Sequence, residues 1–149
     1  MDEDDIILQL WLQPSFEPLM SWTIYSSDNG SFHLRRIRWD FITDVRSSLG
    51  EPSIFGSDAS CPSTVIEPRM KALSALSLPM FNLRDTIGTD GTTYGLRRTT
   101  TGYFAEFSWW WVPPPGCEAI AEWYHDCVAA LEDLLPAHTD HLLNHGVRP

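Results

Sequence analysis

The stretch from residue 103 to residue 135, YFAEFSWWWVPPPGCEAIAEWYHDCVAALEDLL, is the most informative about the fold because it contains a strand, a break and a helix in succession. Over 103–112 the side chains alternate between two faces, as in a β-strand with one face against a core. The prolines and glycine of 113–116 end the strand, since proline cannot donate to a sheet ladder. From residue 117 to residue 135 the apolar residues recur at the helical period.

The predicted helix has one apolar face and one acidic face. At 100° per residue, its apolar side chains share one arc; they are Ile120, Trp123, Tyr124, Cys127, Val128, Leu131, Leu134 and Leu135. Its acidic side chains share the opposite arc; they are Glu118, Glu122, Asp126, Glu132 and Asp133. Exposed helices often place Lys four residues from Glu and gain a few tenths of a kcal/mol per pair. Here no basic residue lies between Arg98 and Arg148.

Working outward, the periodicity predicts further strands and one further helix. The expected strands are 6–12, 21–26, 31–39, 92–99 and 103–112. Asn29-Gly30 is a strong hairpin signal between two of them. The apolar residues of 31–39 change register, which we interpret as a bulge near Arg35 and Arg36.

The remaining segments are a helix and a loop. Thr64 and Glu67 have the spacing of a capping box, so we expect a helix from Thr64 to about Ser77, with Pro68 in its first turn. We expect 41–63, which is rich in Ser, Gly, Asp and Pro, to be a long surface loop with at most one helical turn. It is either a contact region or a mobile insertion.

These elements predict an α+β fold. We expect an antiparallel sheet of about five strands built from hairpins, with two amphipathic helices packed on one face. Residues 1–136 are expected to form a single domain, followed by a polar, His-rich tail at 137–149.

Composition narrows the class of protein. The chain has 149 residues, enough for one domain with its own core. Its seven Trp, seven Phe and four Tyr argue against a disordered chain. The net charge of −10 argues against nucleic acid as a partner, because phosphate binding needs a basic surface. The lack of an 18-residue apolar run argues against a membrane partner.

The start of the chain and its cysteines predict a cytoplasmic protein. The acidic opening Met1-Asp2-Glu3-Asp4-Asp5 has the opposite sign to a secretory signal. Three cysteines without a CxxC pair are typical of a reducing compartment. We expect Cys61, Cys117 and Cys127 to be buried as small apolar side chains.

Charge is distributed unevenly along the chain. Residues 1–34 have a net charge of −6, residues 35–98 of +2, and residues 99–149 of −6. The acidic helix face has two interpretations. It is either a solvated surface that keeps the protein soluble, or a surface that attracts a basic partner and raises its association rate.

The chain contains no recognisable catalytic constellation, and we expect neither an enzyme nor a cofactor. The tail histidines His138, His141 and His145 would share a face if helical, but a solvated tail is the simpler interpretation than a zinc site. His125 lies among the acids of its helix, which suits a charged surface residue rather than a base activating Cys127.

The run of tryptophans at 109–111 offers an alternative function. Exposed rings could stack on a sugar or another small ligand. The competing interpretation places Phe107 and Trp109 beneath the helices and Trp110 on the outer face of the sheet. An exposed Trp110 is also a natural anchor for a protein partner.

Three stretches together carry a resemblance: LQPSF at 12–16 before a Trp-bearing strand, DGTTY at 90–94, and FSWW at 107–110 before prolines and an amphipathic helix. This layout resembles small bacterial α+β proteins, some of which are similar to immunity proteins of polymorphic or contact-delivered toxins. The resemblance implies a cytoplasmic, non-enzymatic inhibitor of one cognate toxin domain. It implies no binding residue by position, because those proteins are diverse.

The charge layout and the resemblance lead to one functional expectation. The chain is expected to be an immunity protein that binds a basic surface or active-site cleft of a toxin, with a small-ligand or carbohydrate-binding module as the alternative. The expected partner-binding residues are Glu118, Glu122, Asp126 and Asp133, with Trp110 as an aromatic anchor.

Overall fold

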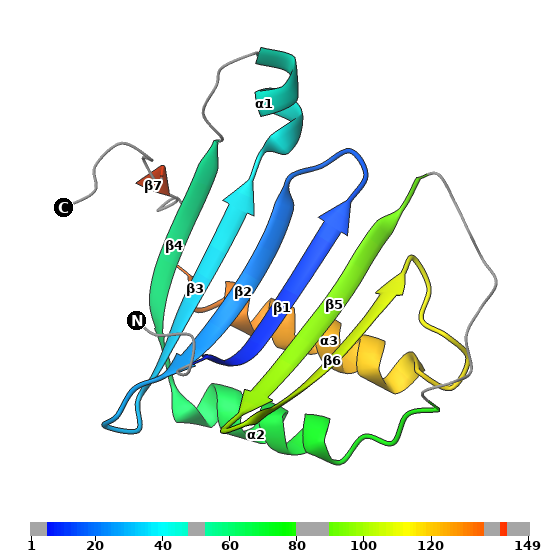
Figure 1. The fold of residues 1–149 in the computed structure, drawn as a ribbon. Coiled ribbons are helices and arrows are strands. Elements are labelled where there is room, and N and C mark those ends of the chain that lie inside the picture. Colours follow the sequence, from blue (N-terminus) through cyan, green and yellow to red (C-terminus); the bar gives the residue numbers. More distant parts are fainter. Residues whose placement is uncertain (1–5, 48–52, 80–89, 136–140, 143–149) are drawn as a thin grey trace.

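The sheet is the centre of the structure, a computed structural model that describes residues 6–47, 53–79, 90–135 and 141–142. Within these residues, six long strands and one two-residue strand pair antiparallel in the order β6-β5-β1-β2-β3-β4-β7 (Figure 1). The strands are β1 (Ile6–Pro14), β2 (Leu19–Ser26), β3 (Phe32–Trp39), β4 (Ile54–Cys61), β5 (Thr92–Thr100), β6 (Tyr103–Trp110) and β7 (His141–Leu142). The first strand of the chain is therefore an inner strand of the sheet.

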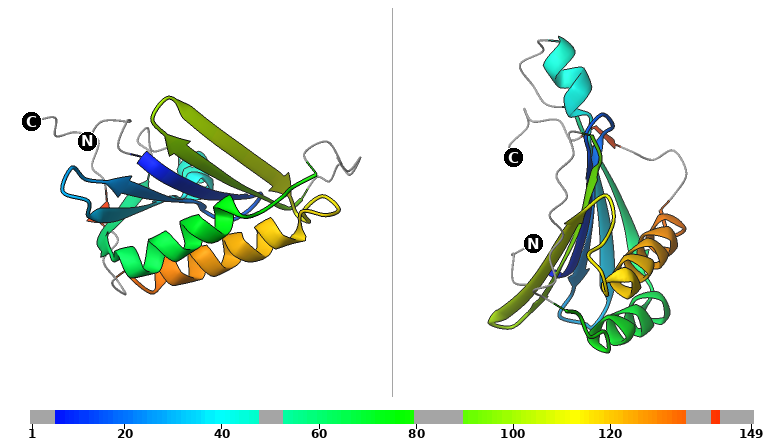
Figure 2. Two further views of the ribbon diagram at one scale, coloured as in Figure 1. Left: turned by 90° about the horizontal axis from the view of Figure 1, so that it is seen from below. Right: turned by 90° about the vertical axis from the view of Figure 1, so that its right-hand side faces the viewer.

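Two helices form a single layer against one face of the sheet. Helices α2 (Ser63–Ser74) and α3 (Glu118–Glu132) lie side by side on that face, while the short α1 (Phe41–Ser47) extends beyond the end of β3 (Figures 1 and 2). The predicted α+β class, with an antiparallel sheet and a helical layer, is confirmed. The expected numbers of strands and helices were too low, because β4 was not predicted and no more than one helical turn was expected where α1 forms. No helix in the described part of the chain is long and apolar enough to cross a membrane.

The tight turns follow from local sequence. Gly30 has a φ of 77°, in the left-handed region that favours glycine, and it lets β2 return as β3 with Ser26 opposite Phe32. The side-chain carbonyl of Asn29 accepts hydrogen bonds from the backbone N–H and hydroxyl of Ser31. The Asn-Gly hairpin is thus confirmed.

The expected loop at 41–63 is the largest correction to the fold. It contains α1 and the whole of β4, which pairs with β3 from Trp39 opposite Ile54 to Phe32 opposite Cys61; residues 48–52 lie outside the described part. The sequence of β4, IFGSDASC, has a weak intrinsic preference for a strand. Pairing with a complete neighbouring strand overrides that preference.

Two further local predictions were wrong. β3 pairs with β2 without a register shift, so there is no bulge at Arg35 and Arg36. The strand alternates regularly, so Arg36 lies on the same face as Leu34 and its side chain points toward the helical layer. Helix α2 starts at Ser63 with Pro62 as its N-cap and no side-chain cap, so no capping box forms, and Pro68 lies inside the helix.

The core lies between the helix-covered face of the sheet and the inner sides of α2 and α3. Its buried side chains are Leu8, Leu10, Trp22, Ile24, Leu34, Cys61, Ile66, Leu96, Trp109, Cys117, Ile120, Ala121, Trp123, Tyr124, Cys127, Leu131 and Leu135. The Tyr124 hydroxyl donates to the carbonyl of Trp11 at 2.8 Å. The Trp123 indole donates to the carbonyl of Arg69 at 2.9 Å. These bonds attach α3 to the sheet and to α2.

On the opposite, open face of the sheet, a close contact between β1 and β5 tests the register. The Trp11 ring covers Gly95, and a Cβ at position 95 would lie 2.1 Å from a ring carbon. We expect Gly95→Ala to lower the free energy of unfolding by about 1–3 kcal/mol, because the ring has to move. In a Trp11→Leu background the same change should cost clearly less. Chemical denaturation of the four variants measures both costs, and equal costs would contradict this contact.

Candidate functional site

The carboxylates predicted as a binding surface do lie together along α3. Glu118, Glu122, Asp126 and Asp133 are all exposed, with Asp133 at the C-cap of the helix. With a rise of 1.5 Å per residue, the row from Glu118 to Asp133 spans about 22 Å. It lies on the arc of α3 opposite the buried side chains of the helix, and so faces away from the core.

One member of this row has a cation from the neighbouring helix. Arg69 of α2 places Nη2 3.1 Å from Oδ2 of Asp126. The same residue's carbonyl accepts the Trp123 indole, so Arg69 is held at the α2–α3 contact. Asp126 therefore stabilises the helix pair, and the expectation of a row without internal cations is wrong at this position.

Glu132, counted with the acidic face in the helical projection, turns toward the sheet instead. Its Oε1 accepts the Trp22 indole N–H at 2.5 Å, and its Oε2 lies 2.6 Å from Nη1 of Arg36. The Arg36 side chain is 15% exposed and the Glu132 side chain 36%, so the ion pair is partly buried. The sequence did contain a sign of this contact. The apolar residues of 31–39 change face near Arg36, and we interpreted that change as a bulge.

The carboxylates of Glu118, Glu122 and Asp133 remain without an ion-pair partner among the described residues. Glu118 lies in the first turn of α3, where the helix dipole favours a negative charge. Asp133 lies at the opposite end, where the dipole disfavours it, and α3 has no basic residue in its last turn. Glu122 and Asp133 thus have no stabilising role inside this part of the chain.

Trp110 does not belong to the same surface. It pairs with Thr93 on the open face, and its ring lies so close to Gly91 that a Cβ there would be 2.7 Å away. The anchor and the α3 carboxylates are therefore on opposite sides of the molecule, because neighbouring residues of a strand point to opposite faces. Of the three tryptophans at 109–111, the exposed one is Trp111, whose φ of 59° turns the chain out of the strand.

The tryptophan run is mainly structural. Trp109 is 5% exposed, stacks on Tyr94 at a centroid distance of 5.5 Å and meets the edge of Tyr124. Its burial confirms the prediction that this ring packs beneath the helices. A row of three exposed rings is therefore not available for stacking on a sugar.

The histidines and cysteines of the described residues do not form a common site. His125 is exposed and contacts the ring of Tyr94, whereas Cys127 is buried. His138 and His145 lie outside the described residues, and His141 is part of β7. Within the described residues, no group of His, Cys, Asp and Glu is arranged to hold a metal ion.

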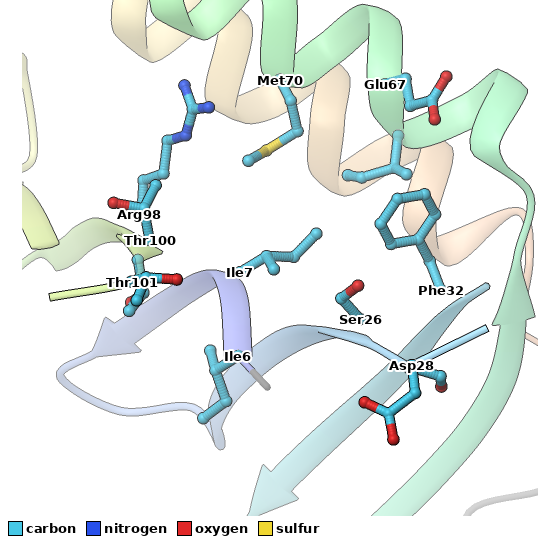
Figure 3. A pocket seen from close by; sticks show the side chains of 13 residues that line it. Ile6, Ile7, Ser26, Asp28, Phe32, Glu67, Met70, Arg98, Thr100 and Thr101 are labelled. Carbon is cyan, nitrogen blue, oxygen red and sulfur yellow. The ribbon is translucent and has the colours of Figure 1, made fainter. Parts of the chain in front are cut away.

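A pocket of about 630 Å³ lies between α2 and the ends of β1, β2, β3 and β5 (Figure 3). Its lining is part apolar and part polar, and the apolar side chains Ile7, Phe32 and Met70 are directed toward one another (Figure 3). Arg98 lies on one side, with its guanidinium donating to the hydroxyl of Ser74, and the carboxylate of Asp28 lies on the other.

Comparison with protein families, with curated proteins and with solved structures finds no match to this chain.

The contacts of Glu132 with Trp22 and Arg36 are expected to stabilise the fold. Glu132→Gln removes the negative charge beside Arg36, and we expect it to lower the free energy of unfolding by about 1–3 kcal/mol. Asp133→Asn is the matched control at the next residue. It should leave stability unchanged or raise it by about 0.3 kcal/mol, because the helix dipole disfavours that charge. Urea denaturation of both variants measures this, and equal effects would contradict the distinction.

The buried thiols are expected to be unreactive. Burial raises the pKa of Cys127 to about 12 and also raises the pKa values of Cys61 and Cys117. Since the thiolate is the nucleophile, little of it exists at pH 8. Iodoacetamide at pH 8 should leave the native protein unlabelled and label all three cysteines in guanidinium chloride. Rapid labelling of a native thiol would contradict their burial.

Proposed function

We propose that this chain is a non-enzymatic binding protein whose partner is another protein with a basic surface. The observation that carries the proposal is the pair Glu122 and Asp133, two exposed carboxylates on the outer side of α3 without a cation among the described residues. Four carboxylates of the described residues have such a partner. Arg35 binds Asp58, Arg36 binds Glu132, Arg69 binds Asp126, and Arg97 binds Glu106.

The cost of this arrangement supports a binding role over a purely solvating one. Asp133 opposes the helix dipole by about 0.3–1 kcal/mol, and nothing in α3 offsets it. A solvated surface needs no carboxylate at that position. A basic partner, by contrast, gains from charges that steer its approach.

We further propose that the partner is a toxin domain and that the chain acts as its immunity protein. The resemblance of the sequence to such proteins supports this, as does the acidic excess, because enzymes that attack nucleic acids or nucleotides tend to have basic clefts. Glu118, Glu122 and Asp133 are the proposed contact residues. Trp110 is omitted, since a partner on the outer side of α3 does not reach the open face of the sheet.

The protein encoded by the neighbouring reading frame is the probe for this function. We expect a tight complex in size-exclusion chromatography that weakens as salt is raised, since the proposed contact is electrostatic. Glu122→Lys with Asp133→Lys should lower the affinity at least tenfold, mainly through a slower association rate. Surface plasmon resonance at low and high salt measures both rates.

Glu17→Lys with Glu67→Lys is the matched control, because both residues are exposed and the net charge changes equally. It should lower the affinity by much less. An equal loss in the control would assign the effect to overall charge, and the absence of a complex would remove the proposed partner.

A further inference from the structure

The outer edge of β6 is free along its whole length in the described structure. β6 pairs with β5 on one side and stands last in the strand order, whereas β7 covers part of β4 at the opposite edge. Figure 1 shows β6 at the margin of the sheet. An eight-residue edge of this kind presents a row of backbone groups to another strand.

The hydrogen-bond pattern identifies which groups face outward. The N–H of Trp111 donates to the carbonyl of Thr92, so this pair belongs to the bonded set of the antiparallel ladder. Bonded and non-bonded pairs alternate, and the register continues without a shift to Tyr103 opposite Thr100. The backbone groups of Phe104, Glu106, Ser108 and Trp110 therefore point away from β5.

The edge lacks the features that keep edge strands apart. Natural proteins commonly protect such an edge with Lys, Pro or a bulge. β6 contains no Lys and no Pro, and its pairing with β5 is regular. Its single charge, on Glu106, is bound to Arg97 at 2.7 Å.

Exposed aromatic side chains lie at both ends of the same edge strand. Tyr103 is 80% exposed, Phe104 68% and Trp111 61%. At 150–250 Å² for a fully covered aromatic side chain, these three expose about 300–500 Å². That is about half of the 800 Å² per partner in a standard protein interface. A strand paired at this edge would cover much of that surface.

We propose that this edge binds the β6 edge of a second copy of the chain, so that two sheets join into one across a two-fold axis. The strands run antiparallel with Phe107 opposite Phe107 of the second copy. Phe104 then lies opposite Trp110, and Glu106 opposite Ser108, each of which is a pair of residues with outward backbone groups. The carbonyl of Trp110 already accepts the Val112 N–H and keeps a second lone pair for this contact.

The self-complementary character of β6 favours a second copy over an unrelated strand. A two-fold axis requires the same surface on both partners, and this register lets the outward groups pair with one another. It also separates the two Glu106 carboxylates, which a register shifted by two residues would place face to face. On the open face it pairs exposed Phe104 with the aromatic ring of Trp110. The inference is independent of the proposed function, because it does not use the outer side of α3.

Removal of one outward backbone donor tests the edge. Ser108→Pro deletes an N–H that does not bond to β5, so β6 itself should persist. Analytical ultracentrifugation should show a dimer for the natural protein and at least a tenfold weaker dimer for the variant.

Ser60→Pro is the matched control on the other edge. The Asp40 N–H donates to the carbonyl of Ser53, so the same alternation points the Ser60 N–H away from β3. This variant should dimerise as the natural protein does, and circular dichroism checks that both variants are folded.

The register has its own test at the same position. Ser108→Glu places a carboxylate opposite Glu106 of the second copy, twice per dimer, and should weaken the dimer about tenfold. Ser108→Lys should keep or strengthen it. A natural protein that stays monomeric at all concentrations would overturn the proposal. So would a dimer that Ser108→Pro leaves intact, since its interface then lies elsewhere. Concentration-independent exchange protection of the Phe104, Glu106 and Ser108 amides would indicate that another segment of the same chain occupies the edge.

Discussion

The carboxylate of Glu132, held by the Trp22 indole and the Arg36 guanidinium, is the interaction on which the arrangement of the helical layer depends. It lies near the C-terminal end of α3 and connects that end to β2 and β3. The Tyr124 hydroxyl fixes the middle of the helix to β1. With both attached, α3 cannot rotate about its axis, so Glu122 and Asp133 are kept on the outside. The surface proposed for binding is therefore a consequence of a contact that lies beneath it.

Local patterns account for the parts of the fold that the sequence predicted. The Asn29-Gly30 turn, the alternating strand 103–112 and the apolar face of α3 depend on residues close together in the chain. β4 depends on a neighbour, because Gly56, Ser57 and Asp58 favour a strand only when β3 supplies the hydrogen bonds. The position of Arg36 on the covered face of β3 also depends on a distant residue. Arg36 is tolerated on the covered face because Glu132 meets it there.

The candidate site shows the same division between local and distant information. Helical periodicity correctly placed Glu118, Glu122, Asp126 and Asp133 on one side of α3, since that depends only on residue spacing. It wrongly counted Glu132 with them, because that side chain turns toward the sheet. It carried no information on which elements lie nearby, and so it did not predict the contact of Arg69 with Asp126. Strand alternation similarly placed Trp110 opposite Trp109. Because Trp109 packs beneath α3, the same alternation places Trp110 on the open face of the sheet, away from the acidic row.

The inner position of β1 has a consequence for synthesis of the protein. β1 pairs with β2 within the first 26 residues, but its other neighbour is β5, with Leu10 opposite Leu96. A chain emerging from the ribosome can thus build β1 to β4 while one side of β1 stays bare. That side is covered only after the hairpin of β5 and β6 has been made. Until then, the middle of the finished sheet is its unprotected border.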